Sequence, residues 1–318
     1  MATGRDYVPI AAADLGSTSV HLLVARIVDH RVEPLVDESE FLGLGEAVEQ
    51  RGLLGAAGRS ELIDALAHFA WTARGAAAES ITFVGTEPLR RLADAARIVG
   101  EVDAATGVPL HVLDHEEEAF LTLIGVTEGR PVVDEIVVVD IGGGSSEFVT
   151  IGPERRARAA GIRIGAAKLT SRLVAHDPPT DDEVEALRTA GRAAAAGAPD
   201  ARPEEVVVVG GTASNLARVV ADRSAGERLG RADLEAAFRL VVAEPADDVA
   251  AAHGIRPARA RILAAGAAIV DAILDRYGAD EVRVVDRGIR EGVVLAVGHA
   301  GAAWRDRLEN LAHGWVDA

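Results

Sequence analysis

Cysteine is absent from this chain of 318 residues, which excludes a disulfide framework, a thiolate metal site and a cysteine nucleophile. Long apolar runs are missing too, because the best candidate, residues 8–25, is interrupted by Pro9 and Asp14 and a bilayer requires roughly 20 apolar residues. Residues 1–7 lack the basic-then-apolar pattern of a secretory signal. We therefore expect a soluble, cytoplasmic protein with no membrane partner.

Positive charge is scarce and is carried almost wholly by arginine, since Lys168 is the only lysine. Fifty acidic residues against 33 basic ones give a net charge of −17, which argues against a nucleic-acid or anionic-membrane surface. A small polyanionic substrate is not excluded, because it needs only a local cluster of donors. At this length, with 49% hydrophobic residues, we expect two domains with packed cores.

Short runs rich in Val, Ile and Leu alternate with Ala-rich amphipathic stretches, which is typical of an α/β fold with strands buried between helices. The predicted strands are Ile10–Asp14, His21–Ile27, Ile81–Val84, Pro109–Leu113, Ile136–Asp140, Glu147–Ile151, Glu205–Val209 and Val282–Val285. The predicted helices are Ser60–Arg74, Glu87–Val99, Glu116–Ile124, Asp181–Ala195, Thr212–Val220, Arg231–Val242, Ala258–Arg276 and Ile289–His299. Thr180 with Glu183 has the spacing of a capping box.

One pattern occurs twice: a strand ending in Asp, a Gly/Ser turn, and a returning strand. Ile10–Asp14 leads into the turn Gly16–Ser19, and Ile136–Asp140 leads into Gly142–Ser145. The spacing of about one domain length predicts duplicated domains, residues 1–127 and 128–318, with the last helices packing back on the first domain. Residues 127–135, which contain Gly and Pro, are the expected hinge.

Each glycine turn exposes backbone N–H groups and hydroxyls to which a phosphate can approach closely. The preceding Asp14 or Asp140 would then lie where it can hold Mg²⁺ directly or through water. A hairpin turn capped by Ser and Asp is the alternative for either turn alone, and the repetition favours phosphate. A strand follows each turn, which distinguishes both from a dinucleotide-binding or P-loop motif.

A third turn, Gly210-Gly211-Thr212, joins a buried strand to a helix whose N-terminal amides would suit an anion; a plain turn with Thr212 as N-cap is the alternative. The acidic run Glu116–Glu118 occupies a predicted helix start, where the helix dipole stabilises carboxylates. Glu147 either faces back toward the second turn or lies at the solvent edge of its strand. Residues 302–315 have the apolar spacing of an amphipathic helix that would close a core or a subunit interface, and the three tryptophans are predicted to be packing residues.

Six motifs in order resemble one family, the exopolyphosphatase/guanosine pentaphosphate phosphatase family of the actin-like ATPase superfamily. These motifs are Asp14-Leu-Gly-Ser-Thr-Ser19, Gly85-Thr-Glu-Pro-Leu-Arg90, Glu116-Glu-Glu118-Ala, Asp140-Ile-Gly-Gly-Gly-Ser-Ser-Glu147, Gly210-Gly-Thr212 and Gly288-Ile-Arg-Glu-Gly292. The resemblance covers about residues 10–297 and is closest to the short two-domain members. It implies two ribonuclease-H-like domains with mixed sheets flanked by helices, and an interdomain cleft with phosphate loops from both domains.

The resemblance also implies a role for each matching position. Glu118 matches the residue that positions or deprotonates the attacking water, and Asp140, Glu147 and Asp14 match acidic residues associated with Mg²⁺ or Mn²⁺. The implied phosphate-binding residues are Gly16, Ser17, Thr18, Ser19, Arg90, Gly142, Gly143, Gly144, Ser145, Gly210, Gly211, Thr212 and Arg290. His21, Arg163 and Lys168 are further candidates for substrate contact.

The implied activity is the hydrolysis of terminal phosphoanhydride bonds of polyphosphate, of short chain length, or of guanosine pentaphosphate (pppGpp). Gly43 departs from the pattern, because relatives have an arginine there, and this loss affects the substrate more than the hydrolytic centre. The alternatives are an ATP-using kinase or ATPase of the same superfamily, and a catalytically weak (p)ppGpp-binding sensor. A homodimer is compatible with the two-fold symmetry common among soluble oligomers.

Overall fold

The computed structural model describes residues 8–152, 157–220 and 228–316, and the chain divides into two compact units. Unit 1 comprises residues 1–131 and 287–318, and unit 2 comprises residues 132–286. The first passage between the units falls inside the predicted hinge, residues 127–135. Within the described ranges, the helices are too short or too polar to cross a membrane.

Unit 1 contains a five-stranded mixed sheet in the order β3-β2-β1-β4-β5. The long antiparallel hairpins pair β1 with β2 and β2 with β3, and β4 and β5 continue parallel to β1. The strands are β1 (Ile10–Leu15), β2 (Ser19–Val28), β3 (Arg31–Phe41), β4 (Ser80–Gly85) and β5 (Leu110–Val112). The helices are α1 (Leu44–Arg51), α2 (Ala56–Gly75), α3 (Glu87–Arg91), α4 (Ala95–Thr106), α5 (His115–Thr127), α13 (Ile289–Ala300) and α14 (Leu308–Ala312), with short 3₁₀ turns η1 (Gly301–Ala303) and η2 (Arg305–Arg307).

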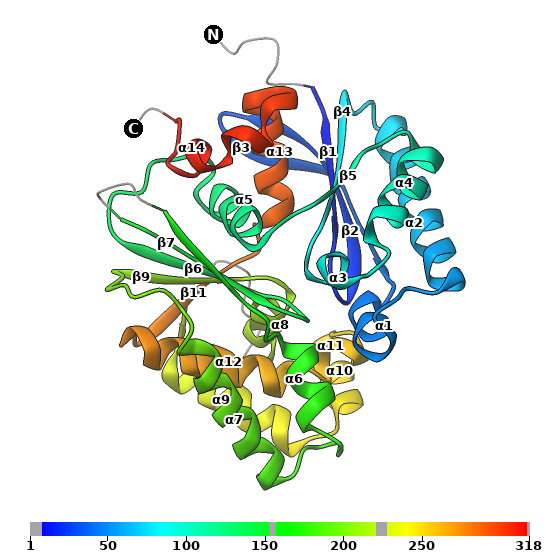
Figure 1. Ribbon diagram of the computed structural model, residues 1–318. Coiled ribbons are helices and arrows are strands. Elements are labelled where there is room, and N and C mark those ends of the chain that lie inside the picture. The colour runs from blue at the N-terminus through cyan, green and yellow to red at the C-terminus, as the bar shows by residue number, and fades with distance from the viewer. Residues whose placement is uncertain (1–7, 153–156, 221–227, 317–318) are drawn as a thin grey trace. The chain divides into compact units, whose positions relative to one another are not determined.

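Helices cover both faces of this sheet, with α2 and α4 over one face and α13 and α5 over the other (Figure 1). Alternate residues of β1 and β2, such as Leu22, belong to one apolar core with Leu66 and Phe69 of α2. On the other side α13 contacts β1 and β2 and packs along α5. This layering places the first turn of α5 and the first turn of α13 in the same unit as the first glycine turn.

Unit 2 contains a six-stranded mixed sheet in the order β10-β11-β9-β6-β7-β8. Its strands are β6 (Ile136–Ile141), β7 (Ser146–Ile151), β8 (Arg158–Ile162), β9 (Glu205–Val209), β10 (Arg228–Gly230) and β11 (Glu281–Val285). Its helices are α6 (Ala166–Leu173), α7 (Asp181–Ala195), α8 (Gly211–Val220), α9 (Arg231–Ala243), α10 (Ala246–His253), α11 (Pro257–Ala260) and α12 (Leu263–Tyr277). Val137, Val139 and Ile141 of β6 belong to one apolar core with residues of α8, α9 and α12.

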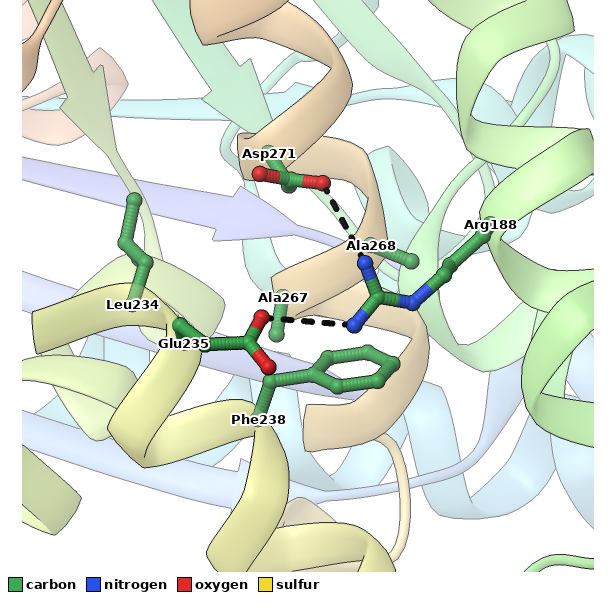
Figure 2. A pocket seen from close by; sticks show the side chains of 7 residues that line it. All are labelled: Arg188, Leu234, Glu235, Phe238, Ala267, Ala268 and Asp271. Atoms are coloured by element: carbon green, nitrogen blue, oxygen red, sulfur yellow. Dashed lines mark hydrogen bonds and ion pairs between the residues drawn. The ribbon is translucent and has the colours of Figure 1, made fainter. Parts of the chain in front are cut away.

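Three of the outer helices of unit 2 leave a small apolar pocket between them (Figure 2). Arg188 of α7 lies over the ring of Phe238 of α9, 4.4 Å from its centroid. The same guanidinium forms ion pairs with Glu235 and Asp271. The arginine thus ties α7, α9 and α12 together, and the pocket is part of the helix packing.

The predicted fold class is confirmed, and all eight predicted strands are present. The sequence prediction missed β3, β8 and β10 and divided several helices wrongly. The single helix expected over 87–99 is two helices, α3 and α4, and the helix expected over 302–315 is two 3₁₀ turns and α14. Trp71 was predicted to be a packing residue, but it is 72% exposed on α2.

The predicted domains, 1–127 and 128–318, are regions that we expect to fold as units. Contacts within one folded chain do not test whether a region folds by itself. The two domains stay a prediction. In the structure α13 packs on α5 and β1, so the segment from Arg287 onward belongs with the first sheet.

Candidate active site

The first glycine turn connects β1 to β2 and is closed by a hydrogen bond from the Gly16 N–H to the Ser19 carbonyl, 3.1 Å long. Asp14 lies two residues before the turn and stands opposite His21 in the antiparallel register. The segment after β3 folds onto the turn, since the N–H groups of Gly43 and Gly45 donate to the carbonyls of Thr18 and Ser17. Gly43, which departs from the pattern that the resemblance implies, therefore adjoins the turn directly.

Gly43 has a left-handed backbone, with φ of 61°, and precedes the first residue of α1. A side chain in that conformation is strained. The departure from the family pattern thus has a local structural counterpart, because the backbone at this position favours glycine.

Helix α3 adjoins the first turn and carries a residue that the sequence prediction did not select. The Thr86 hydroxyl donates to the Leu15 carbonyl, 3.0 Å, and the Ser17 hydroxyl donates to Glu87, 3.4 Å. Glu87 is 3% exposed and also accepts from Arg91. Its place inside the motif Gly85–Arg90 was the available signal for a buried carboxylate beside the turn.

Glu118 lies in the first turn of α5 and is 6% exposed. Arg90 of α3 donates to its carboxylate at 2.6 Å and to the Leu113 carbonyl at 2.8 Å, and its other nitrogen lies 3.0 Å from His115. The predicted water-positioning residue and a predicted phosphate ligand are therefore an ion pair. This pair holds the Glu118 carboxylate in one orientation.

Arg290, in the first turn of α13, donates to Asp37 of β3 at 2.6 Å. Burial alone would lower its pKa, yet the charges of Glu291, Asp37 and Asp14 together raise the pKa above its ordinary value. Arg290 thus lies within the electrostatic range of Asp14 and stays charged, as a phosphate ligand would have to be.

In unit 2, Asp140 of β6 and Glu147 of β7 stand directly opposite each other across the antiparallel pair. Glu147 is 2% exposed, so of the two predicted orientations it takes the buried one rather than the solvent edge. Burial raises the pKa of Asp140 to about 6. Two carboxylates in such an environment repel each other unless a proton or a cation is present.

The second glycine turn repeats the hydrogen bond of the first, with the Gly142 N–H donating to the Ser145 carbonyl at 3.0 Å. The first turn of α6 packs against it, since the N–H groups of Ala166 and Lys168 donate to the carbonyls of Gly142 and Gly143. Lys168 therefore adjoins the turn through its backbone, whereas Arg163 is exposed between β8 and α6.

The third turn lies beside Asp140, because a Cβ on Gly210 would come within 2.7 Å of an Asp140 carboxylate oxygen. Helix α8 starts at Gly211, so Thr212 lies inside its first turn and is not the N-cap. A Cβ on Gly211 would lie 3.3 Å from a guanidinium nitrogen of Arg259. Burial and the neighbouring Arg256 lower the pKa of Arg259.

Arg259 is a cation beside a glycine turn that the sequence prediction missed. The available signal was the cluster of arginines at 256, 259 and 261, which lies more than 40 positions from the third turn. The predicted site residues thus gather into one group in each unit. Unit 1 joins Asp14, the first turn, Arg90, Glu118 and Arg290, and unit 2 joins Asp140, Glu147 and the other two turns.

Comparison with known proteins gives one consistent result. Residues 23–299 match the Ppx/GppA phosphatase family. The chain is similar to exopolyphosphatase 1 of Mycobacterium tuberculosis, with 28% identity over 90% of this chain and 87% of that protein. It is also similar to guanosine-5'-triphosphate,3'-diphosphate pyrophosphatase of Vibrio cholerae, with 32% identity over 44% of this chain and 28% of that protein.

The fold is shared with a solved structure, the Ppx/GppA family member of Aquifex aeolicus. The TM-score is 0.79 and the identity 26%, over 91% of this chain and 97% of that one. The predicted actin-like ATPase fold is therefore confirmed, and so is the resemblance on which the site residues were selected.

Proposed function

The chain belongs to the Ppx/GppA phosphatase family, and on this premise we propose that it hydrolyses terminal phosphoanhydride bonds of short-chain polyphosphate, of pppGpp, or of both. The names of its relatives, exopolyphosphatase and guanosine-5'-triphosphate,3'-diphosphate pyrophosphatase, support these two substrates. The observation that carries the proposal is the pair Asp140 and Glu147, which stand opposite each other on β6 and β7 beside a glycine turn.

This pair fits a divalent cation. Both residues offer carboxylate oxygens, which Mg²⁺ and Mn²⁺ prefer. Burial raises the pKa of Asp140 to about 6, and a cation beside it would favour the charged carboxylate. We propose that Asp140 and Glu147 hold Mg²⁺ or Mn²⁺, with Asp14 as a further acidic residue. A bound metal would supply neutralising charge for the phosphoryl oxygens.

The remaining residues would orient the reactants. The backbone amides and hydroxyls of Gly16–Ser19 and Gly142–Ser145 are suited to phosphate oxygens, and Arg290 offers a charged guanidinium beside Asp14. Glu118, held by Arg90, would accept a proton from the attacking water or orient it toward phosphorus. Phosphoryl transfer needs mainly such positioning and charge stabilisation.

Phosphate release with Mg²⁺ from polyphosphate, pppGpp and ATP tests the proposal. We expect release from at least one of the first two, and release from ATP alone would favour the kinase or ATPase alternative. Glu118→Gln should lower kcat by about 10²–10⁴-fold, the usual contribution of a general base. Glu116→Gln is the matched control, because Glu116 lies in the same helical turn and is exposed.

A variant Glu118→Gln with full activity would remove Glu118 from the mechanism. Tight (p)ppGpp binding without any phosphate release would instead favour the sensor alternative. The proposal extends to a cytoplasmic protein without a nucleic-acid or membrane partner, and a homodimer is compatible with it.

A further inference from the structure

Two arginines from distant parts of the sequence hold the turn that leads into α5. Arg90 binds it on one side, as described above. Arg305, in the 3₁₀ turn η2 that follows α13, binds it on the other. All three segments belong to unit 1.

The contacts of Arg305 parallel those of Arg90, displaced by one residue. Arg305 donates through Nη2 to the Val112 carbonyl at 2.9 Å and to Glu117 Oε2 at 2.8 Å, and through Nε to Glu117 Oε1. Arg90 donates to the next carbonyl, Leu113, and to the next carboxylate, Glu118. Each guanidinium thus binds one of two consecutive carbonyls and one of two consecutive carboxylates. The Arg305–Glu117 pair is bidentate, which gives it a defined geometry.

Glu117 already has a structural task in this turn. Its carboxylate accepts from the Asp114 N–H at 2.9 Å, and its own N–H donates to Asp114 Oδ1 at 2.8 Å, which completes the capping box of α5. Glu117 Oε2 therefore accepts from Asp114 and Arg305 together. Arg305 fixes the side chain that closes the helix start immediately before Glu118.

Arg305 is itself held in place by its neighbour. Trp304 is 4% exposed and lies edge-on to His111 of β5, with ring centroids 5.5 Å apart. Helix α14, which follows η2, packs on α5. The tail that carries Arg305 is thus anchored on the same strand and helix that it connects.

We propose that Arg305 is a positioning residue for Glu118, acting through Glu117 and the capping box of α5. The proposal rests on the role of Glu118 given under the proposed function. Loss of the Arg305 contacts would leave α5 folded but would allow its first turn to move, and a displacement of about 1 Å at a reacting group can cost as much as 10²-fold in rate.

The test compares Arg305→Ala and Arg305→Lys with Arg307→Ala, a control in the same turn whose side chain is exposed. We expect Arg305→Ala to lower kcat by about 10- to 100-fold with little change in KM. Lysine, which cannot form the fork, should recover only part of this loss. Arg307→Ala should behave as the unchanged protein.

A cycle with Glu118→Gln separates positioning from general destabilisation. If Arg305 acts through Glu118, Arg305→Ala lowers kcat no further in the Glu118→Gln background. An equal loss in both backgrounds, a change in KM alone, or an unchanged kcat would overturn the proposal.

Hydrogen exchange gives a readout that does not depend on activity. Arg305→Ala should speed amide exchange in residues 113–121 while exchange in α2 stays unchanged. A protein that releases no phosphate would refute the proposed function. Hydrogen exchange would then test only whether the Arg305 contacts order the first turn of α5. Unchanged exchange in residues 113–121 would overturn the proposal in either case.

Discussion

Helices α5 and α13 cross so closely that a single methyl group should separate them. A Cβ on Gly292 of α13 would lie 1.8 Å from the Leu121 carbonyl oxygen of α5, and a Cβ on Gly125 would lie 2.0 Å from the Gly288 carbonyl oxygen. Both obstacles are backbone atoms, so no side-chain rotation can relieve the overlap. We therefore predict that Gly292→Ala forces the two helices apart.

The size of the effect follows from two opposing contributions. Alanine is favoured over glycine in a helix by about 0.5–1 kcal/mol, whereas overpacking costs about 1–3 kcal/mol. The overlap with backbone places Gly292→Ala at the upper end of that range, so a net loss of about 2 kcal/mol in the free energy of unfolding is expected. Leu121 lies one turn after Glu118, so kcat should fall as well.

Tryptophan fluorescence is the suitable probe of denaturant unfolding, because Trp71, Trp304 and Trp315 all belong to unit 1. The matched control is Gly100→Ala in α4, where nothing lies within 4 Å of the added methyl group. This control should stabilise unit 1 by about 0.5–1 kcal/mol. A Gly292→Ala protein whose unfolding midpoint shifts in the same direction as that of Gly100→Ala would refute the reasoning.

Three further predictions concern the helix-capping residue Glu183, the buried phenol of Tyr277, and Gly43, which departs from the family pattern. Hydrogen bonds from the N–H groups of Ala175 and Thr180 and from the His176 side chain lower the pKa of Glu183 to about 2. The ionised Glu183 carboxylate therefore stabilises the fold above its ordinary pKa, and this stabilisation is lost as pH falls toward 2. Glu183→Gln should therefore flatten the acid limb of a circular-dichroism unfolding profile, and an unaltered limb would contradict this. Burial raises the pKa of Tyr277 to about 12, so the neutral phenol contributes fully to stability below its ordinary pKa, and this contribution is lost as pH rises through 12. Tyr277→Phe should therefore remove a step near pH 12 from the absorbance titration at about 295 nm. Loss of a step near pH 10 instead would refute the burial argument. Gly43→Arg should cost about 1–2 kcal/mol through its left-handed backbone while lowering the KM for polyphosphate, and an unchanged KM would show that the added charge does not reach the substrate.

The repeated turn was predictable because every part of it is local. Strand, Asp, glycine turn and returning strand follow one another directly, and the structure gives both copies the same closing hydrogen bond. The capping box of Thr180 and Glu183 is present for the same reason. Patterns that are complete within about ten residues can be predicted from the sequence.

Other features could not be predicted, because they depend on residues far apart in the sequence or because their sequence pattern is weak. β3 is exposed along most of its length at the edge of its sheet, so it shows no alternation of apolar and polar residues. The pairs Arg90–Glu118 and Arg305–Glu117 join residues 28 and 188 positions apart. Arg90 and Glu118 were each selected from a motif, but neither pairing is visible in the sequence, and only the fold of unit 1 brings the partners together.

The two glycine turns differ in the residue opposite their aspartate, and this difference divides the chemistry between them. Asp140 stands opposite a second carboxylate, Glu147, whereas Asp14 stands opposite His21 and interacts with the charge of Arg290. Asp14 thus has a cation within electrostatic range, whereas Asp140 and Glu147 place two carboxylates side by side, an arrangement that a cation would stabilise. We therefore centre the proposed metal site on Asp140 and Glu147, and the first turn, Arg290 and Glu118 keep the roles proposed for them with the phosphate and the attacking water.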